Sequence, residues 1–115
     1  MRQPKHLDKY GKTQWQKYAP SLRTRPDITE QDWHNLECFC VNYASFRTAL
    51  DDVQKNGLIL TFSNDNKGAN PAFKAMMEAQ KLMIKFGELL GFDPISRSKF
   101  NPQEDNLDEL DKLLS

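Results

Sequence analysis

The segment from Thr29 to Gly57 carries the strongest helix signals in the chain and limits what the other residues can fold into. Thr29 is a good N-cap, Asp32 three residues later approximates a capping box, and Gly57 supplies a left-handed stop after Asn56. The side chains that recur along this predicted helix fall in two stripes. One stripe contains Trp33, Leu36, Cys40, Tyr43, Arg47 and Leu50, and the other contains Phe39, Phe46 and Val53. Two stripes require burial on two sides of the helix. Because a chain of only 115 residues has little else with which to cover both sides, we expect other subunits to complete part of this burial.

A helix is also predicted near the N-terminus, from about Lys12 to Leu22, because apolar side chains recur there at helical spacing. The recurring side chains are Trp15, Tyr18, Ala19 and Leu22. Pro20 conflicts with this pattern and is expected to kink the helix or to end it early. Residues 1–11, which precede the helix, have a high charge density and are predicted to form a flexible basic arm.

Residues 58–69, which follow the long helix, are predicted to form a short β-like hairpin or an extended link. An apolar run opens this segment and a polar turn cluster follows it. Asn70 and Pro71 then provide an N-cap and a first helical residue, which is a standard helix start. The resulting helix is predicted to run to Leu90, where Gly91 stops it.

The C-terminal part is predicted to contain a short helix over 95–100 and then an acidic tail over 101–115. The leucines of the tail fall on one helical face, but so short a helix is not stable alone, which predicts that the tail folds on a partner. These leucines are Leu107, Leu110, Leu113 and Leu114. The chain is therefore predicted to be mainly α, with a small helical core over 12–100 between the arm and the tail.

The formal net charge of zero hides an uneven distribution of charge along the chain. Residues 1–25 contain seven basic side chains and one acidic side chain, a net charge of +6, whereas residues 101–115 contain five acidic side chains and one basic, a net charge of −4. A basic end and an acidic end on a neutral chain suggest two different partners. The alternative is that both ends are solvated tails.

The sequence contains no recognisable catalytic constellation. It has no glycine-rich phosphate loop, and neither His6 nor His34 has the companion ligand at i+4 that a metal-binding helix would show. Cys38 and Cys40 lack zinc-ligand spacing and are expected to be reduced thiols. We therefore expect a binding protein rather than an enzyme, with no cofactor and no metal. No apolar run approaches the length of a membrane span and no signal peptide is recognised, so a cytosolic protein is expected.

The basic side chains near the N-terminus alternate with aromatic ones, a pattern typical of surfaces that neutralise phosphates and release counterions. The residues expected to bind nucleic acid are Lys5, Lys9, Lys12, Lys17, Arg23 and Arg25. Trp15 and Tyr18 share the apolar face of the predicted helix and are instead expected to belong to the core. The alternative interpretation is an ordinary basic surface.

The order of these features resembles the P27 family of tailed-phage terminase small subunits over about residues 12–100. The resemblance rests on a tryptophan in the first helix, on the Asn70-Pro71 helix start and on the ending of the last long helix. That ending reads Leu90-Gly91-Phe92-Asp93-Pro94-Ile95-Ser96-Arg97. The resemblance implies a mainly helical, non-enzymatic protein that is one subunit of a ring. Such a subunit selects double-stranded viral DNA for packaging, and it recruits or regulates a large subunit that holds the ATPase and nuclease.

The resemblance also suggests roles for particular residues. The ring is expected to form through side chains of the two long helices, namely Phe39, Phe46, Val53, Met76 and Met83. The tail is expected to dock on the large subunit through its leucines, in the cytoplasm of a bacterial host, and Arg97 to bind either an acid across a subunit contact or a phosphate. Two other classes remain open: a helix-turn-helix DNA-binding regulator, which predicts a short second helix, and a helical structural adaptor without a nucleic-acid role.

Overall fold

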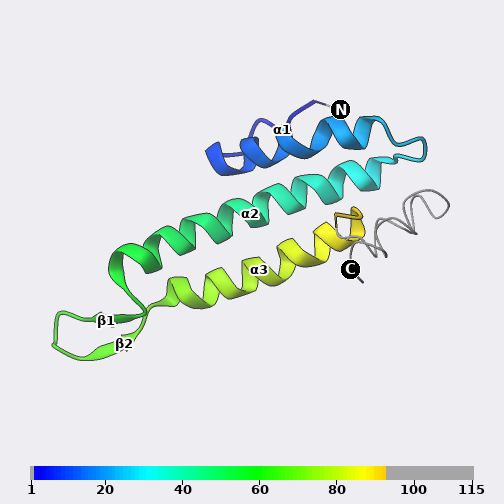
Figure 1. The fold of residues 1–115 in the computed structure, drawn as a ribbon. Helices are drawn as coiled ribbons and strands as arrows, with labels where there is room; N and C mark the ends of the chain where they lie inside the picture. The colour runs from blue at the N-terminus through cyan, green and yellow to red at the C-terminus, as the bar shows by residue number, and fades with distance from the viewer. Residues whose placement is uncertain (1, 93–115) are drawn as a thin grey trace, which may run out of the picture.

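The computed structural model describes residues 2–92, which form three α-helices and one β-hairpin (Figure 1). The helices are α1 (Lys9–Arg23), α2 (Glu30–Asn56) and α3 (Pro71–Leu89), and the antiparallel hairpin pairs β1 (Ile59–Thr61) with β2 (Lys67–Ala69). The predicted mainly helical class, with a short hairpin between the long helices, is confirmed. The predicted helix over 95–100 and the acidic tail lie outside the described residues.

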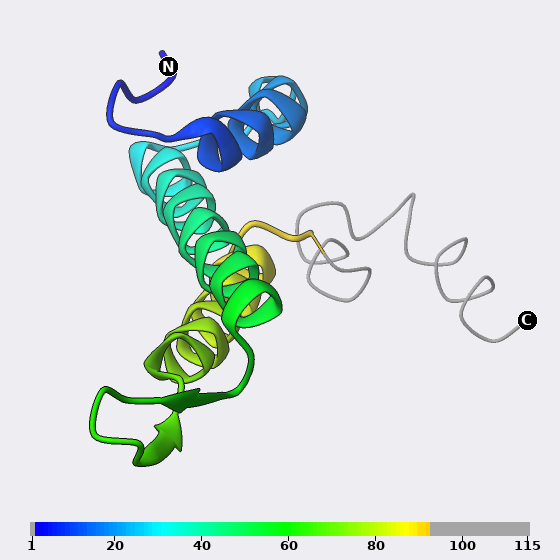
Figure 2. The same ribbon diagram turned by 90° about the vertical axis from the view of Figure 1, so that its left-hand side faces the viewer.

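The helices lie side by side with α2 in the middle (Figures 1 and 2). α1 lies along one side of α2 from its N-terminal end as far as Asp51, and α3 runs antiparallel to α2 along another side, while the hairpin lies at the far end. The chain therefore covers α2 on two sides with its own helices. The expectation that other subunits complete part of this burial stays a prediction.

The side chains expected at a subunit interface are used largely inside the chain. Phe39 is 8% exposed, and its ring meets Phe92 edge-on with the ring centroids 5.1 Å apart. The prediction of an intersubunit role for Phe39 is therefore corrected, because its ring is covered where α2 packs against the C-terminal end of α3. The other four residues are half-buried and lie, by helical spacing, on the facing sides of α2 and α3: Phe46, Val53, Met76 and Met83.

α1 begins three residues earlier than the apolar pattern predicts. The side chain of Asp8 accepts a hydrogen bond from the Gly11 amide at 2.9 Å and caps the helix. Leu7, in the predicted arm, is 4% exposed and belongs to the core. Pro20 does not end the helix, which runs on to Arg23, because Pro20 is exposed and water can satisfy the carbonyl that loses its backbone partner there.

α2 begins and ends at the predicted residues. Thr29 and Asp32 form a reciprocal capping box, in which the Thr29 amide donates to the Asp32 carboxylate at 2.9 Å and the Asp32 amide donates to the Thr29 hydroxyl at 3.3 Å. At the other end Gly57 has a φ of 88°, a conformation that favours glycine, and its amide donates to the carbonyl of Val53. These local signals explain why a helix of 27 residues has such definite limits.

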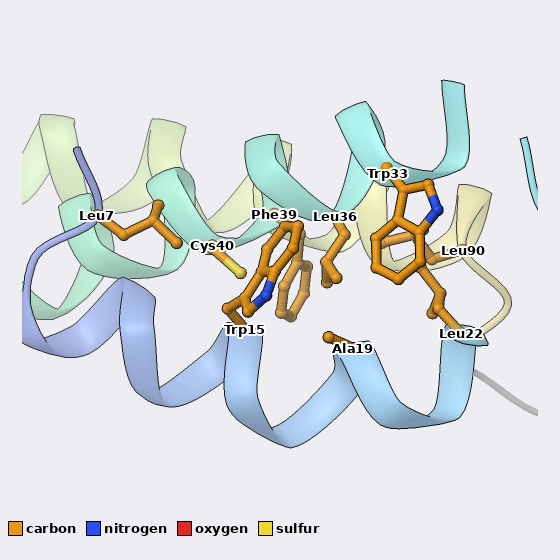
Figure 3. Close-up of a cluster of buried hydrophobic side chains, with 9 residues drawn as sticks. All are labelled: Leu7, Trp15, Ala19, Leu22, Trp33, Leu36, Phe39, Cys40 and Leu90. Atoms are coloured by element: carbon orange, nitrogen blue, oxygen red, sulfur yellow. The ribbon is translucent and has the colours of Figure 1, made fainter. Parts of the chain in front are cut away.

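The core gathers where all three helices approach one another, around the N-terminal half of α2 (Figure 3). Trp15 of α1 and Trp33 of α2 lie with their ring centroids 5.7 Å apart. Tyr18 stacks on Phe92 at 4.1 Å, and both rings contact Phe39. The largest fully buried side chains of this core are Leu22, Leu36, Cys40 and Leu90. The core thus holds α1 and the end of α3 on the same part of α2.

Asn70 joins α2, the hairpin and α3 at a single buried side chain. Its Oδ1 accepts from the Ala72 amide at 2.9 Å and caps α3, while its Nδ2 donates to Asp52 and to the carbonyl of Gly57, each at 2.9 Å. Asn70 is 4% exposed. The hydrogen bond that Asn70 donates to Asp52, and a further one from Asn56, hold the pKa of Asp52 below its usual value. The predicted Asn70-Pro71 start is therefore also a tertiary contact.

The hairpin carries apolar side chains that the described residues leave exposed. Phe62 lies over Gly68, and a Cβ at that glycine would be only 2.7 Å from the ring. Leu58 is 52% exposed, Ile59 60% and Phe62 47%. The end of the molecule farthest from α1 thus presents apolar surface.

Replacing Asn70 by alanine should lower the free energy of unfolding by about 2–3 kcal/mol, because the cap of α3 is lost together with the hydrogen bonds from this buried side chain to Asp52 and to the Gly57 carbonyl. Urea unfolding followed by circular dichroism measures this loss. Asn56→Ala is the matched control, since it removes only an exposed 3.2 Å hydrogen bond to the same oxygen of Asp52. It should cost less than about 0.5 kcal/mol. Equal losses in the two variants would contradict the role of Asn70.

Candidate nucleic-acid interface

The solvent-facing side of α1 is basic along its whole length. Lys9, Lys12, Lys17 and Arg23 are all exposed, whereas Trp15 and the other apolar residues of the helix point toward α2 (Figure 3). The helix has 15 residues, a length of about 22 Å, and contains no acidic side chain. We call the surface formed by these four basic side chains the basic face of α1. It is a linear array of positive charge on a rigid element.

The placement of charge in α1 opposes the helix dipole. Lys9 and Lys12 lie in or next to the first turn, where the dipole is positive and acidic side chains are stabilising. α2 follows the stabilising rule, because Glu30 and Asp32 occupy its first turn. The basic start of α1 therefore adds nothing to the stability of the helix, but it adds to the positive potential that an anion would meet there.

Aromatic rings lie beneath several of the basic side chains. The ammonium of Lys9 is 5.0 Å from the centroid of Tyr10, and that of Lys17 is 5.2 Å from the centroid of Tyr18. The guanidinium of Arg23 lies 5.7 Å from the ring centroid of Trp33. Among residues 2–92, no carboxylate forms an ion pair with Lys9, Lys12 or Lys17. The ammonium groups of Lys9 and Lys17 thus lie close to aromatic rings while their charge remains available to an anion.

Tyr10 anchors the start of α1 to the C-terminal half of α2, a contact that the sequence pattern does not indicate. Its hydroxyl donates a short hydrogen bond to the carboxylate of Asp51, which raises the pKa of Tyr10. The guanidinium of Arg47 lies 5.1 Å from the centroid of the same ring and donates to the Tyr43 hydroxyl at 3.4 Å. Asp51 and Asp52, adjacent in sequence, therefore bind different partners on different sides of α2.

Two of the six predicted nucleic-acid contacts lie apart from this face. Arg25 is half-buried after the end of α1, and its Nη1 donates to the carbonyl of Leu90 at 2.5 Å. This bond ties the end of α3 to the segment between α1 and α2, so Arg25 has a structural contact. Lys5 is exposed in the segment before the helix. The structure thus brings together Lys9, Lys12, Lys17 and Arg23.

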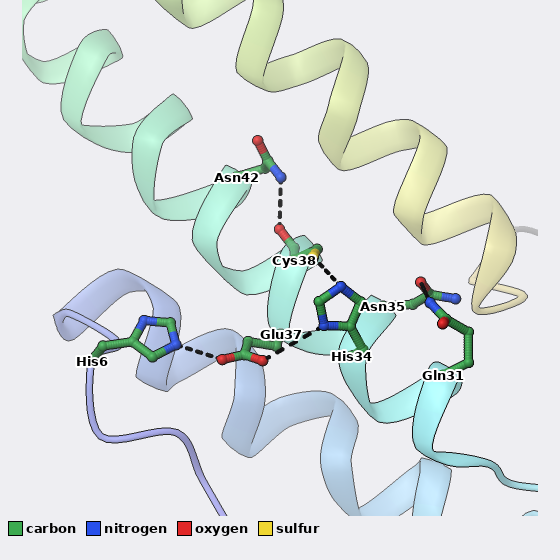
Figure 4. A network of polar contacts seen from close by, with 7 residues as sticks. All are labelled: His6, Gln31, His34, Asn35, Glu37, Cys38 and Asn42. Carbon is green, nitrogen blue, oxygen red and sulfur yellow. Dashed lines mark hydrogen bonds and ion pairs between the residues drawn. The ribbon is translucent and has the colours of Figure 1, made fainter.

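The N-terminal segment is held on α2 by a small polar network (Figure 4). His6 Nε2 lies 2.5 Å from a carboxylate oxygen of Glu37, and His34 Nδ1 lies 4.0 Å from the other oxygen. The His34 ring also contacts the Cys38 thiol at 3.6 Å. Within the part of the chain that the structure describes, neither these residues nor any other three histidine, cysteine or acidic side chains are arranged so that they could hold a metal ion.

The two cysteines are free thiols on different sides of α2. Burial raises the pKa of Cys40 to about 12, and the carboxylate of Glu37 adds to that effect. Burial also raises the pKa of Cys38, which is only partly covered. Neither thiol therefore has the lowered pKa that a nucleophilic cysteine requires.

Comparison with known proteins gives this arrangement a family. The chain matches the phage terminase small subunit family over residues 11–106, which is most of its length. It therefore belongs to that family, which is generally the non-catalytic subunit of the terminase. No curated protein and no solved structure matches the chain. No helix among residues 2–92 is long and apolar enough to cross a membrane.

Arg25→Gln should destabilise the fold, because the carbonyl of Leu90 loses a charged donor. The expected loss is about 1–2 kcal/mol in the free energy of unfolding, measured by urea titration. Arg2→Gln, in the exposed segment before α1, makes the same chemical change and should shift stability by less than about 0.5 kcal/mol. A loss from Arg2→Gln as large as that from Arg25→Gln would contradict the structural role assigned to Arg25.

Proposed function

We propose that this chain is the DNA-recognition subunit of a viral genome-packaging terminase, and that it binds double-stranded viral DNA through the basic face of α1. The observation that carries this proposal is a 15-residue helix whose outward side bears four cations and no acid. Such an array can neutralise several phosphates along a duplex without reading bases, which gives affinity that depends strongly on salt. Family membership supports the same role.

Within the family we assign the chain to the P27 branch. The support is the combination of the Asn70-Pro71 helix start with the ending Leu90-Gly91-Phe92-Asp93-Pro94-Ile95-Ser96-Arg97. Asn70 has a structural task in this chain, since it caps α3 and bonds to α2. Residues 93–97 lie outside the described residues, so the role of Arg97 stays a prediction.

A helix-turn-helix regulator is the less favoured alternative. That class needs a short second helix with a side free to enter the major groove. α2 has 27 residues, and its N-terminal half is covered by α1 on one side and by α3 on another. A structural adaptor without a nucleic-acid role is the other alternative, and it is separated from our proposal by the DNA-binding experiment that follows.

Changing Lys9, Lys12 and Lys17 together to glutamine should weaken binding to duplex DNA more than tenfold at low salt. It should also reduce the slope of log affinity against log salt by about 1 for each lysine that contacts a phosphate. Fluorescence anisotropy over a salt series measures both quantities. The fold should be as stable as before or slightly more so, because two of the lysines oppose the dipole of α1.

The matched control changes Lys74, Lys81 and Lys85 of α3 to glutamine. These three lysines are also exposed, and the change in net charge is identical. Their replacement should reduce affinity by less than about threefold, through long-range electrostatics alone. An equal loss in both variants, or unchanged binding in the α1 variant, would remove the basis of the proposal.

We propose further that the protein assembles into a ring through apolar surface that one chain leaves exposed. Phe73, Met77 and Ile84 form a ridge on one flank of α3 and are 41%, 39% and 51% exposed. The other flank of α3 borders an open groove of about 500 Å³ whose walls carry small side chains. These include Ala44, Ser45, Thr48, Ala72 and Ala75. A ridge and a groove on different flanks suit head-to-tail contacts, which close into rings.

Replacing Phe73, Met77 and Ile84 together by serine should reduce the molar mass in multi-angle light scattering from that of an oligomer toward that of one chain. Helicity should be retained, since these side chains are already exposed. The control replaces Lys74, Lys81 and Lys85 by serine and should leave the mass unchanged. A ridge variant with the same mass as the unaltered protein would exclude this surface from the assembly.

The remaining part of the proposal concerns the acidic tail. We propose that it recruits or regulates the large subunit, which holds the ATPase and nuclease, through Leu107, Leu110, Leu113 and Leu114, in the cytoplasm of a bacterial host. The support is the spacing of these leucines on one helical face. The tail lies outside the described residues.

A further inference from the structure

The described part of the chain ends in contact with α1. The ring of Phe92 stacks on that of Tyr18, with centroids 4.1 Å apart and an interplanar angle of 18°. Two residues earlier, the carbonyl of Leu90 accepts the hydrogen bond from Arg25 at 2.5 Å. The C-terminal end of α3 is therefore fixed against the helix that carries the basic face. Residues 93–115 follow from this point.

The charges of the two segments are complementary. Lys9, Lys12 and Lys17 of the basic face form no ion pair with a carboxylate of residues 2–92. Residues 101–115 contain five acidic side chains and one lysine. The acidic side chains are Glu104, Asp105, Asp108, Glu109 and Asp111. The chain thus contains an anionic segment whose charge is opposite in sign to that of the basic face of α1 and similar to it in number of charges.

The chain is long enough for the two segments to meet. Glu104 follows Phe92 by twelve residues, which span at most about 43 Å when fully extended, and α1 is about 22 Å long. Every basic side chain of α1 is therefore within reach. A connection of this length costs little entropy to close and holds the acidic segment at millimolar effective concentration near the helix.

We propose that the acidic tail docks on the basic face of α1 in its own chain and competes there with DNA phosphates. The competition with DNA rests on the function proposed above, whereas the docking itself does not. The acidic residues alternate with the four leucines along the tail, so the leucines stay available while the carboxylates bind α1. A partner that binds the leucines and withdraws the tail then exposes the basic face, which couples DNA binding to assembly with that partner.

Zero-length carbodiimide cross-linking of the full chain without DNA tests the docking directly. The tail carboxylates should couple to Lys9, Lys12 and Lys17 at least fivefold more than to Lys74, Lys81 and Lys85, as identified by mass spectrometry. The yield should fall on raising the salt from about 50 mM to about 500 mM, because exposed charge pairs are screened. Equal coupling to both sets of lysines would overturn the proposal. So would cross-links that mostly join light to heavy chains in an isotopically mixed sample.

DNA affinity tests the competition. The variant Asp105→Asn, Asp108→Asn, Asp111→Asn should bind duplex DNA at least threefold more tightly at low salt, with the gain shrinking as salt rises. The charge-matched control Asp27→Asn, Glu78→Gln, Glu88→Gln changes three acidic residues outside the tail and should alter affinity by less than about 1.5-fold. An equal gain in the two variants, or no gain in the tail variant, would overturn the competition.

The two proposals fail in different ways. If the unaltered chain forms cross-links to α1 but the Lys9, Lys12, Lys17 variant binds DNA as before, the docking is supported and the DNA-binding role of α1 is contradicted. If the variant loses DNA binding but the unaltered chain forms no cross-links to α1, the DNA-binding role is supported and the docking is overturned.

Discussion

The packing of α2 between α1 and α3 is the contact on which the other features of the molecule depend. Tyr18 of α1 contacts Phe39 of α2 and Phe92, which follows α3, and these rings bring the three helices together at the N-terminal half of α2. Apolar side chains of α1 are buried against this part of α2, so its polar side faces solvent. The basic face is therefore a consequence of the core, since any rotation of α1 that hid the lysines would expose Trp15 and Leu22.

The helix limits were predictable because their causes are local. Thr29, Gly57, Asn70 and Gly91 act on backbone groups within a few residues of themselves, and the structure places helix ends at or beside each of them. The start of α1 was missed, although Asp8 is itself a capping residue, because the apolar pattern begins only at Trp15. The burial of Leu7 was missed for the same reason, since a single apolar residue among charged ones forms no periodic pattern.

The contacts between distant segments could not be predicted from spacing. A second apolar stripe on α2 indicates burial but not whether the cover comes from the same chain, and α3 provides it here. Among the basic residues, Arg25 looked equivalent to its neighbours, yet its partner is a backbone carbonyl 65 residues away. The contact of Tyr10 with Asp51 spans 41 residues. Such pairings follow from the assembled fold, whereas the run of lysines on α1 follows from the sequence alone.

The length of α2 has an evolutionary consequence. Its 27 residues span about 40 Å, with the aromatic contacts of Trp33 and Phe39 near its N-terminal end and the exposed apolar hairpin beyond its C-terminal end. Substitutions separated by much more than about 10 Å usually have additive effects on stability. The aromatic core around Trp33 can therefore change between related viruses without disturbing the hairpin, and the hairpin can change without disturbing that core. The long helix allows the two ends of the protein to diverge at separate rates.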